Sequence, residues 1–363
     1  MSMLSEFAIF SNGKKRPKRE GEYPVYGGNG ILGSACDYNM ENGIVVGRVG
    51  AYCGSVHLER GKCWVSDNAI KVEQTERSNL AFLYYLLKYL KLNERRIGTS
   101  QPLLTQGILN SIEVNVPDIH IQEKIAEILE GFDKKIQLNT EINENLEQQA
   151  ATYFYHQFIA NADPSWREGT ISDLGTVIGG STPSKKKSEY YTDKGIAWIT
   201  PKDLSVDKSK FISHGADDIT ELGLKNSSAS IMPTGTVLFS SRAPIGYIAV
   251  ADGEVTTNQG FKSVVPHSNV GTAFVYYFLK NALPTIENMA SGSTFKEVSG
   301  SAMRTVPAII PDDESLQEFA DFCEPLFQQQ RTLEAENRSL TSLRDSLLPK
   351  LMSGELDVSD LNF

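Results

Sequence analysis

The sequence predicts an α+β protein in which two duplicated domains of mixed α/β structure are joined by two long helices that form an antiparallel coiled coil. Three observations predict this fold class. The stretch FLYYLLK at 82–88 recurs as FVYYFLK at 274–280, with five of the seven residues identical. Other short segments recur in the same order. Each half of the chain then enters an acidic stretch whose apolar residues have helical spacing.

The recurrences begin near the start of the chain and continue through both halves. The further pairs, in chain order, are 4–7 with 171–174, 44–48 with 237–242, 66–72 with 256–264, and 98–100 with 292–294. Each half then reaches a proline, Pro117 or Pro311, at the same offset of 194 residues. A repeat spacing of 194 residues is too long for the unit of a solenoid protein, so the pattern indicates a duplicated domain.

The two acidic stretches are predicted to be long helices because their apolar residues recur every three or four positions. In the first these residues are Ile121, Ile125, Ile128, Phe132, Ile136, Ile142, Leu146, Ala150 and Tyr153. In the second they are Leu316, Phe319, Cys323, Leu326, Leu333, Leu340, Leu347 and Leu351. Asn139, Gln330 and Asn337 occupy seam positions, where polar residues fix the register of a coiled coil. The alternative is two surface helices packed on separate cores, but two helices of matching length favour pairing with each other.

These patterns give the predicted domain organisation. The segments are a first domain at 1–117, a first long helix at 118–158, a linker at 159–168, a second domain at 169–311, a second long helix at 312–353 and a tail at 354–363. The linker contains Asp163-Pro164, which favours a turn at the end of the first helix. A helix of some 38 residues would span roughly 57 Å.

Within each domain, apolar runs predict strands and the Tyr-Tyr segments predict amphipathic helices. The strands at 44–48 and 237–242 each end on an arginine, Arg48 or Arg242. Adjacent residues such as Tyr84 and Tyr85 cannot share one face of a helix, so at most one ring of each pair is expected in the core. The Tyr-Tyr segments are therefore interpreted as structural helices, with a binding role as the less favoured alternative.

Composition is ordinary for a globular protein, with 40% hydrophobic and 22% charged residues. No apolar run reaches the roughly 18 residues that a membrane helix needs, and the four cysteines form no CxxC pair. A reducing cytoplasm is therefore the expected location. The net charge of −10 is concentrated in the helical stretches, because the segments 1–117 and 164–311 carry +3 and +1. Two mildly basic domains keep nucleic-acid binding open.

Several motifs that suggest chemistry have the wrong context. GNGILG at 28–33 fits a dinucleotide-binding pattern, but turn-forming residues follow it where that site needs a helix. Cys36, Cys53, His57 and Cys63 have no usual zinc spacing. The carboxylates of Asp118 and Asp133 resemble a nuclease pattern but lie about 22 Å apart along one predicted helix. No catalytic or metal site is predicted.

Basic runs are better candidates for a site. Lys14, Lys15, Arg16, Lys18 and Arg19 lie early in the first domain, and Lys185, Lys186 and Lys187 lie at the equivalent place in the second. A charge run is usually solvated surface, but two runs at matching places favour contacts with phosphates. Arg48 and Arg242 could bind a guanine edge, or each could be buried against a carboxylate; the sequence favours neither.

The sequence as a whole resembles the specificity subunit of a type I restriction-modification system. In the first half the resemblance rests on YPVYGGNGILG at 23–33, VVGRVGAYCG at 45–54, WVSDNAI at 64–70 and GTSQPLLTQ at 98–106. In the second half it rests on GIAWITPKDL at 195–204, TTNQGFK at 256–262, GSTFKEVSG at 292–300 and SLLPKLMSGEL at 346–356. The chain departs from the family's pattern in starting almost directly at Leu4 and in reading Gln-Glu rather than Glu-Gln at each helix entry.

The resemblance implies that each domain is a target-recognition domain for one half of a bipartite, asymmetric double-stranded DNA site. The helices would then fix the distance between the halves and dock two methyltransferase subunits, with restriction subunits as further partners. The chain itself would be non-catalytic, with S-adenosylmethionine, ATP and Mg on the partner subunits. A coiled-coil scaffold without DNA specificity and a cryptic metal-dependent nuclease are the alternatives.

The predicted DNA-binding residues combine the basic runs with polar residues in the recurring segments. They are Lys14, Lys15, Arg16, Lys18, Arg19, Arg48, Asn68, Ser100 and Gln101 in the first domain, and Lys185, Lys186, Lys187, Lys202, Arg242, Asn258, Gln259, Thr294 and Lys296 in the second.

Overall fold

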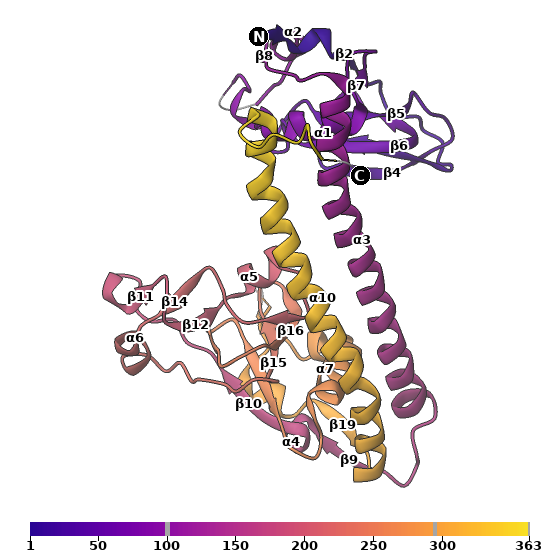
Figure 1. Cartoon of the computed structure of the whole chain (residues 1–363). Coiled ribbons are helices and arrows are strands. Elements are labelled where there is room, and N and C mark those ends of the chain that lie inside the picture. The colour runs from indigo at the N-terminus through magenta and orange to yellow at the C-terminus, as the bar shows by residue number, and fades with distance from the viewer. Residues whose placement is uncertain (99–101, 293–295, 362–363) are drawn as a thin grey trace. The chain divides into compact units, whose positions relative to one another are not determined.

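The structure is a computed structural model that describes residues 1–98, 102–292 and 296–361 (Figure 1). The chain divides into two compact units. The first unit contains residues 1–137 and 337–363, and the second contains residues 138–336. Each unit therefore combines a domain of mixed strands and helices with one part of each long helix, and the predicted α+β fold class is confirmed.

The first unit is built on a six-stranded sheet with the strand order β2-β7-β5-β6-β3-β4. Its strands are β2 (Ala8–Asn12), β3 (Tyr23–Gly27), β4 (Gly30–Ala35), β5 (Met40–Gly47), β6 (Val56–Val65) and β7 (Ala69–Gln74). Neighbouring strands are antiparallel except β3 and β6, which are parallel. A separate pair joins β1 (Ser2–Met3) to β8 (Glu113–Val114).

The second unit has a five-stranded sheet in the order β10-β18-β15-β16-β13 and a four-stranded sheet in the order β11-β14-β12-β17. The first sheet contains β10 (Gly175–Gly179), β13 (Phe211–Ile212), β15 (Val237–Ser241), β16 (Ile245–Ala251) and β18 (Lys262–Pro266). The second contains β11 (Tyr191–Thr192), β12 (Ile196–Ile199), β14 (Asp217–Ile219) and β17 (Thr256–Thr257). Strands β9 (Arg167–Thr170) and β19 (Pro307–Ile310) form a further antiparallel pair.

The strand orders confirm the duplication. The antiparallel run β2-β7-β5-β6 of the first unit recurs as β10-β18-β15-β16 in the second, and in both units one more strand pairs in parallel with the last of the four. The recurring segments 44–48 and 237–242 therefore belong to the equivalent strands β5 and β15, and the segments 66–72 and 256–264 enter the equivalent strands β7 and β18. Strand β5 ends one residue before Arg48 and β15 one residue before Arg242.

Short helices complete the two domains. They are α1 (Leu80–Tyr89) and α2 (Gln106–Asn110) in the first unit, and α4 (Ile171–Leu174), α5 (Pro201–Val206), α6 (Glu221–Lys225), α7 (Thr272–Asn281), α8 (Leu283–Asn288) and α9 (Gly300–Arg304) in the second. Helix α1 begins where the side chain of Asn79 accepts hydrogen bonds from the backbone N–H groups of Ala81 and Phe82, which satisfies donors that the helix cannot pair itself.

The Tyr-Tyr segments are helices α1 and α7, as predicted, but one expectation about them is wrong. In α1 only Tyr85 is fully buried, and Tyr84 is half-buried. In α7 both Tyr276 and Tyr277 are buried. The second ring is covered because Phe327 of the second long helix packs edge-on against Tyr276, with ring centroids 6.1 Å apart. Helix α7 therefore buries more than one face.

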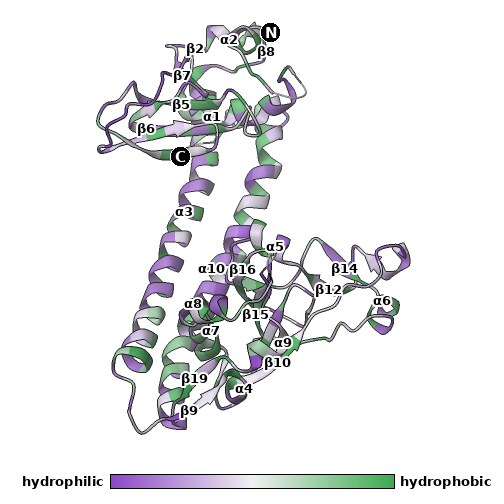
Figure 2. Cartoon of the chain, turned by 180° about the vertical axis from the view of Figure 1, so that it is seen from behind, coloured by the Kyte–Doolittle hydropathy of each residue, from purple (hydrophilic) through white to green (hydrophobic). Residues whose placement is uncertain are grey.

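The long helices are α3 (Ile119–Tyr155) and α10 (Asp313–Ser353). Hydrophobic and hydrophilic residues alternate along both (Figure 2). Asp118 caps α3 by accepting from the backbone N–H groups of His120 and Ile121, and Asp312 caps α10 by accepting from that of Ser315. Such caps use the side-chain oxygen to satisfy the exposed donors of the first turn.

Residue pairs show that α3 and α10 run antiparallel within each unit. In the first unit Asp133 of α3 pairs with Arg344 of α10, and Lys124 donates to the backbone oxygen of Ser359 in the tail that follows α10. In the second unit the seam residue Asn139 donates to Glu336 at 2.8 Å, and the seam residue Gln330 donates to the backbone oxygen of Asn143 at 3.1 Å. As one residue number rises, its partner's falls, which confirms the antiparallel pairing.

The motifs judged to lack the right context are accounted for by the fold. GNGILG spans the turn between β3 and β4 and the start of β4, so a hairpin follows where a dinucleotide site needs a helix. The four cysteines are free, and the described part of the chain contains no group of three His, Cys, Asp or Glu residues that could hold a metal ion. None of the described helices is both long and apolar enough to cross a membrane.

Candidate nucleic-acid interface

The basic loop of the first unit, residues 14–19, is fixed at its root to the end of β6. Gly13 precedes it, and a Cβ at Gly13 would lie 1.9 Å from the backbone oxygen of Ser66. The backbone N–H of Lys14 donates to Val65 at 3.0 Å, and the indole N–H of Trp64 donates to the oxygen of Lys14 at 3.0 Å. Only glycine permits this approach, and the two hydrogen bonds hold the start of the loop in place.

The loop presents its cations to solvent. Lys14, Lys15, Arg16, Lys18 and Arg19 are all exposed. Arg16 also donates to the backbone oxygen of Ser34 in β4 at 3.2 Å, which ties the middle of the loop to the edge of the sheet. The loop thus concentrates positive charge along one edge of the sheet, in a form suited to contacts with phosphates.

Arg48 and Asn68 lie beside this loop root. The backbone N–H of Arg48 donates to the oxygen of Asn68 at 2.9 Å, and the guanidinium group donates to the oxygen of Asp67 at 3.4 Å. Ser66, two residues before Asn68, forms the bridge to Lys14. The end of β5, the turn between β6 and β7, and the basic loop therefore form one surface, which contains all the predicted first-domain residues that the structure describes.

The second unit repeats this construction with other residues. A Cβ at Gly180 would lie 2.0 Å from the backbone oxygen of Asn258, and the N–H of Ser181 donates to Thr257 at 2.9 Å. The indole N–H of Trp198 donates to the oxygen of Ser181 at 3.0 Å. A glycine, a strand end and a tryptophan again fix the root of a lysine-bearing loop, although this tryptophan comes from β12, a strand of the additional four-stranded sheet.

The lysines of this second loop are exposed, and two of them lie against aromatic rings. The Nζ of Lys185 lies 5.8 Å from the ring centre of Trp198, and that of Lys187 donates to the hydroxyl of Tyr190 at 3.0 Å. Lys186 is exposed as well. These contacts hold two of the three lysine side chains near the sheet, while their charges stay accessible to a polyanion.

Polar residues of the second domain gather around the same loop. Thr182 donates to the side-chain oxygen of Gln259, and the N–H of Asn258 donates to Ile199 at 3.0 Å. Lys202 is exposed on α5, which begins where Pro201 packs close to Gly260. The structure therefore brings Lys202, Asn258 and Gln259 to the root of the lysine loop.

Arg242 pairs with a carboxylate, as one alternative expected, but it is not buried. Its guanidinium lies 3.6 Å from the carboxylate of Glu297, but 35% of its side chain stays exposed. Lys262 pairs with the same carboxylate at 3.6 Å. Arg48 contacts a backbone carbonyl instead and is half-buried. Lys296 is exposed beside this cluster, whereas Ser100, Gln101 and Thr294 lie outside the described residues.

Sequence reasoning missed Lys262, Glu297, Trp64 and Trp198. The pairing of 66–72 with 256–264 already placed Lys262 within a recurring segment, so its position could have been inferred from the duplication. The two tryptophans could not have been inferred from the duplication, because they lie at unrelated places in the two repeats. They are equivalent only in that each one binds the root of a basic loop.

Each domain is also bound to the long helices through the second tyrosine of its Tyr-Tyr segment. In the first unit the hydroxyl of Tyr85 donates to Asp133 of α3 at 2.6 Å, and Arg344 of α10 binds the same carboxylate. In the second unit the hydroxyl of Tyr277 donates to Glu147 of α3 at 2.8 Å. The recurring Tyr-Tyr segments thus anchor the domains to the helices. Asp133, part of the nuclease-like pattern, is engaged in this anchor.

The anchor in the second unit contains a buried lysine. The Nζ of Lys210 pairs with Glu147 and donates to Gln330 at 2.8 Å and to Tyr277 at 3.2 Å. Burial alone would raise the pKa of Glu147, but the ammonium groups of Lys210 and Lys280 outweigh it and hold that pKa below its ordinary value. Residues from α3, α10, α7 and the segment before β13 therefore meet at one buried charge.

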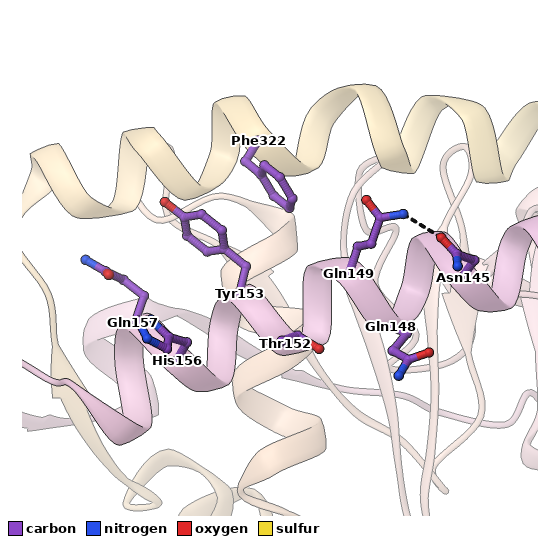
Figure 3. A pocket seen from close by; sticks show the side chains of 8 residues that line it. All are labelled: Asn145, Gln148, Gln149, Thr152, Tyr153, His156, Gln157 and Phe322. Carbon is purple, nitrogen blue, oxygen red and sulfur yellow. Dashed lines mark hydrogen bonds between the residues drawn. The ribbon is translucent and has the colours of Figure 1, made fainter.

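A groove of about 590 Å³ lies in the second unit between the end of α3 and the start of α10 (Figure 3). The rings of Tyr153 and Phe322 both line it and stack on each other, with centroids 4.7 Å apart. The other lining residues are mostly amides: Asn145, Gln148, Gln149 and Gln157, together with Thr152 and His156. This groove offers hydrogen-bonding groups and one aromatic contact on the helices.

Comparison with known proteins gives the family. The family model of the type I restriction modification DNA specificity domain matches residues 4–148 and 164–341. The chain therefore belongs to this family, as the resemblance predicted, and each half of the chain matches its DNA specificity domain. The duplication of the fold agrees with the two matched segments, one in each half of the chain.

Individual relatives agree. The chain is 41% identical over 171 residues to the type I restriction enzyme MjaIX specificity subunit of Methanocaldococcus jannaschii, covering 47% of this chain and 39% of that subunit. It is 26% identical over 357 residues to the HindI specificity subunit of Haemophilus influenzae, covering 76% of this chain and 77% of that one. The crystal structure of a type I restriction-modification S subunit from M. genitalium has the same fold, with a TM-score of 0.66 at 20% identity over 99% of this chain and 96% of that one.

Proposed function

We propose that this chain is the non-catalytic DNA-specificity subunit of a type I restriction-modification complex, and that each domain binds one half of a bipartite, asymmetric site in double-stranded DNA. The observation that carries the proposal is the repeated construction of the loop root. A glycine, a strand end and a tryptophan fix a basic loop at the same end of equivalent sheets, but the side chains around each loop differ. One framework with two sets of contact residues suits two different half-sites.

Within each domain the residues divide into two roles. We assign the phosphate contacts, which position the domain without selecting a sequence, to the exposed lysines and arginines of the loops at 14–19 and 185–187. We assign the contacts with base edges to Arg48 and Asn68 in the first domain, and to Arg242, Asn258, Gln259 and Lys202 in the second. The pairing of Arg242 with Glu297 supports this role, because it orients a fork of donors that is still partly exposed.

The long helices set the spacing between the half-sites and dock two methyltransferase subunits. Their charge supports a protein partner, because the stretches 118–163 and 312–363 carry net charges of −6 and −8, which DNA would repel. The amide-lined groove beside Tyr153 gives such a partner hydrogen-bonding groups on the helices. S-adenosylmethionine, ATP and Mg would bind the partner subunits, including any restriction subunits.

A comparison of DNA methylation in the host with and without this gene tests the proposal. Deletion of the gene should remove methylation from one bipartite motif whose halves are separated by unspecified bases, and the intact gene on a plasmid should restore it. An unchanged methylation pattern would contradict the proposal. Metal-dependent cutting of DNA by the purified chain alone would instead support the nuclease alternative.

A further inference from the structure

The hairpin β3–β4 of the first domain carries two large aliphatic side chains that the proposed DNA contacts do not use. Ile31 is 61% exposed and Leu32 is 48% exposed, and both lie on β4, the edge strand of the six-stranded sheet. Exposed neighbouring aliphatic residues on an edge strand are unfavourable unless they contact something. Their position therefore indicates a surface that becomes covered when the protein acts.

Leu32 is the extra residue of a β-bulge. Val25 lies opposite Gly33 and Tyr26 lies opposite Ile31, so that Leu32 has no cross-strand partner between them. Bulges redirect side chains and are common next to functional sites. Here the redirected side chain lies over Gly27, because a Cβ at Gly27 would come within 2.5 Å of the Cδ1 of Leu32.

This direction places Leu32 inside the basic surface. The Oγ of Ser66 lies 3.6 Å from the same point above Gly27, and Ser66 is the residue that pairs with Lys14. On the other side, a Cβ at Gly33 would lie 2.7 Å from the guanidinium of Arg16. An exposed leucine therefore lies beside the root of the loop that is proposed to hold phosphates, and the next residue, Gly33, lies against the guanidinium of Arg16. This charge complementarity favours DNA over a protein strand as the partner of the hairpin.

We propose that Leu32 is an apolar wedge that enters between neighbouring bases of duplex DNA when the first domain binds, and opens one base step. The inference rests on the DNA-reading function proposed above and adds a residue to it. Leucine and isoleucine side chains can unstack a base step when cations hold the flanking phosphates. Flexible pyrimidine–purine steps are the easiest to open, so the wedge would favour such a step without any hydrogen bond to a base.

The test uses the full-length chain and a duplex that the wild-type chain selects from a random-sequence pool. A fluorescent base analogue replaces each base of the half-site in turn, and its emission rises when its neighbours unstack. The wild-type chain should raise the emission at one step. Leu32→Ala should abolish the rise and weaken binding by roughly tenfold, because the apolar contact is lost.

Two variants serve as controls. Ile9→Ala removes an aliphatic side chain that is 54% exposed on β2, the opposite edge strand of the same sheet, and should change neither signal nor affinity. Leu32→Met keeps an apolar side chain of similar volume and should keep the signal. Thermal unfolding should be alike for all three variants, since each site is exposed.

The outcomes separate this inference from the proposed function. Normal binding without a rise at any position, or a rise that survives Leu32→Ala, would overturn the wedge and leave DNA reading intact. A Leu32→Ala variant that binds and distorts DNA normally but no longer co-purifies with a methyltransferase subunit would make the hairpin a protein contact, which also overturns the wedge. A wild-type chain that selects no sequence would overturn both.

Discussion

Gly13 and Gly180 show how a single residue decides whether a DNA-contacting loop can be built. At each of these positions a Cβ would lie within about 2 Å of a backbone oxygen, at Ser66 in the first case and at Asn258 in the second. Real Cβ atoms do not come this close, and a backbone oxygen in a paired strand end cannot move aside as a flexible side chain can. Both loop roots therefore require glycine because of close approach, with no need for an unusual backbone conformation.

The change Gly13→Ala should therefore displace the root of the loop and separate Lys14 from Val65. We expect binding to all duplexes to weaken by roughly tenfold, since the loop holds phosphates and phosphate contacts carry no sequence information. The measurement is the affinity for a set of duplexes at two salt concentrations. Gly107→Ala is the matched control, because that glycine lies in the short helix α2 of the same domain and a Cβ there would meet only the Oγ1 of Thr105, at an ordinary contact distance of 3.8 Å. If both variants bound DNA like the wild type, the loop would not contact phosphates.

At the scale of secondary-structure elements, the domains are attached to the long helices by polar contacts that differ between the two units. The first unit uses the buried Tyr85 together with Asp133 and Arg344, and the side chains of this charged pair stay 33% and 17% exposed. The second uses Lys210 and Glu147, and the side chain of Lys210 is only 6% exposed. Glu334 adds to the second attachment by accepting from the backbone N–H groups of Lys210 and Phe211 at 2.8 and 3.1 Å. A buried charge depends on its partner, so the second attachment is the more sensitive of the two.

Removal of that partner gives a prediction. Glu147→Gln leaves the ammonium of Lys210 buried without its carboxylate and should destabilise the second unit by about 3 kcal/mol. Replacing both residues, as Glu147→Leu with Lys210→Met, should cost less than the single change. Thermal unfolding gives the stability, and amide hydrogen exchange around Phe211 locates the effect. Glu144→Gln, one turn earlier on the exposed face of α3, should change stability by no more than about 0.5 kcal/mol.

The same pair gives a pH dependence. Because the folded pKa of Glu147 lies below its ordinary value of 4.5, the unfolded chain binds this proton before the folded chain does as the pH falls. The stabilisation is therefore fully present above about pH 4.5 and is lost as the pH falls through the folded pKa. The stability difference between wild type and Glu147→Gln should shrink in that range. A difference that stayed constant down to pH 3 would show that the carboxylate is not the source of the stability.

These attachments mark the limit of what the sequence predicts about the elements. The long helices follow from local spacing of apolar residues, and the strand pairs follow from the recurring segments. Lys210 lies 63 residues after Glu147 and 120 before Gln330, so no local pattern connects them. The expectation that at most one ring of each Tyr-Tyr pair lies in the core was wrong at Tyr276 for the same reason, because the residue that covers this ring is Phe327 of the distant helix α10. Gln122 likewise looks like a surface residue of a helix entry, but it is buried and binds the backbone of Arg77, Asn79 and Pro117.

At the scale of the whole molecule, the charge distribution separates two kinds of surface along one chain. Mildly basic domains and acidic helices add up to a net charge of −10, which alone would argue against nucleic-acid binding. The sequence alone predicts this separation of charge, because only the charged residues within each segment have to be counted. The candidate site was predicted less completely. Its basic loops were found from composition, but the tryptophans and the bulged Leu32 depend on strand register, which the sequence does not reveal.

The last prediction concerns the independence of the two domains. If each domain binds its own half-site, Arg48→Ala should relax base preference in one half and leave the other unchanged, and Arg242→Ala should do the reverse. Each loss should cost about 1–3 kcal/mol at a single base pair, since an arginine fork discriminates one base from the others by that amount. The measurement is binding to duplexes that carry single substitutions across the whole site. Arg338→Ala is a suitable control, because Arg338 is exposed on the long helix α10. Equal weakening for every duplex would make the two arginines phosphate contacts, and an effect of both changes on the same half would contradict independent reading.

Arg242 adds a further expectation through its carboxylate partner. Glu297→Gln should disturb the same base pair as Arg242→Ala but less strongly, because the guanidinium remains and only its orientation is loosened.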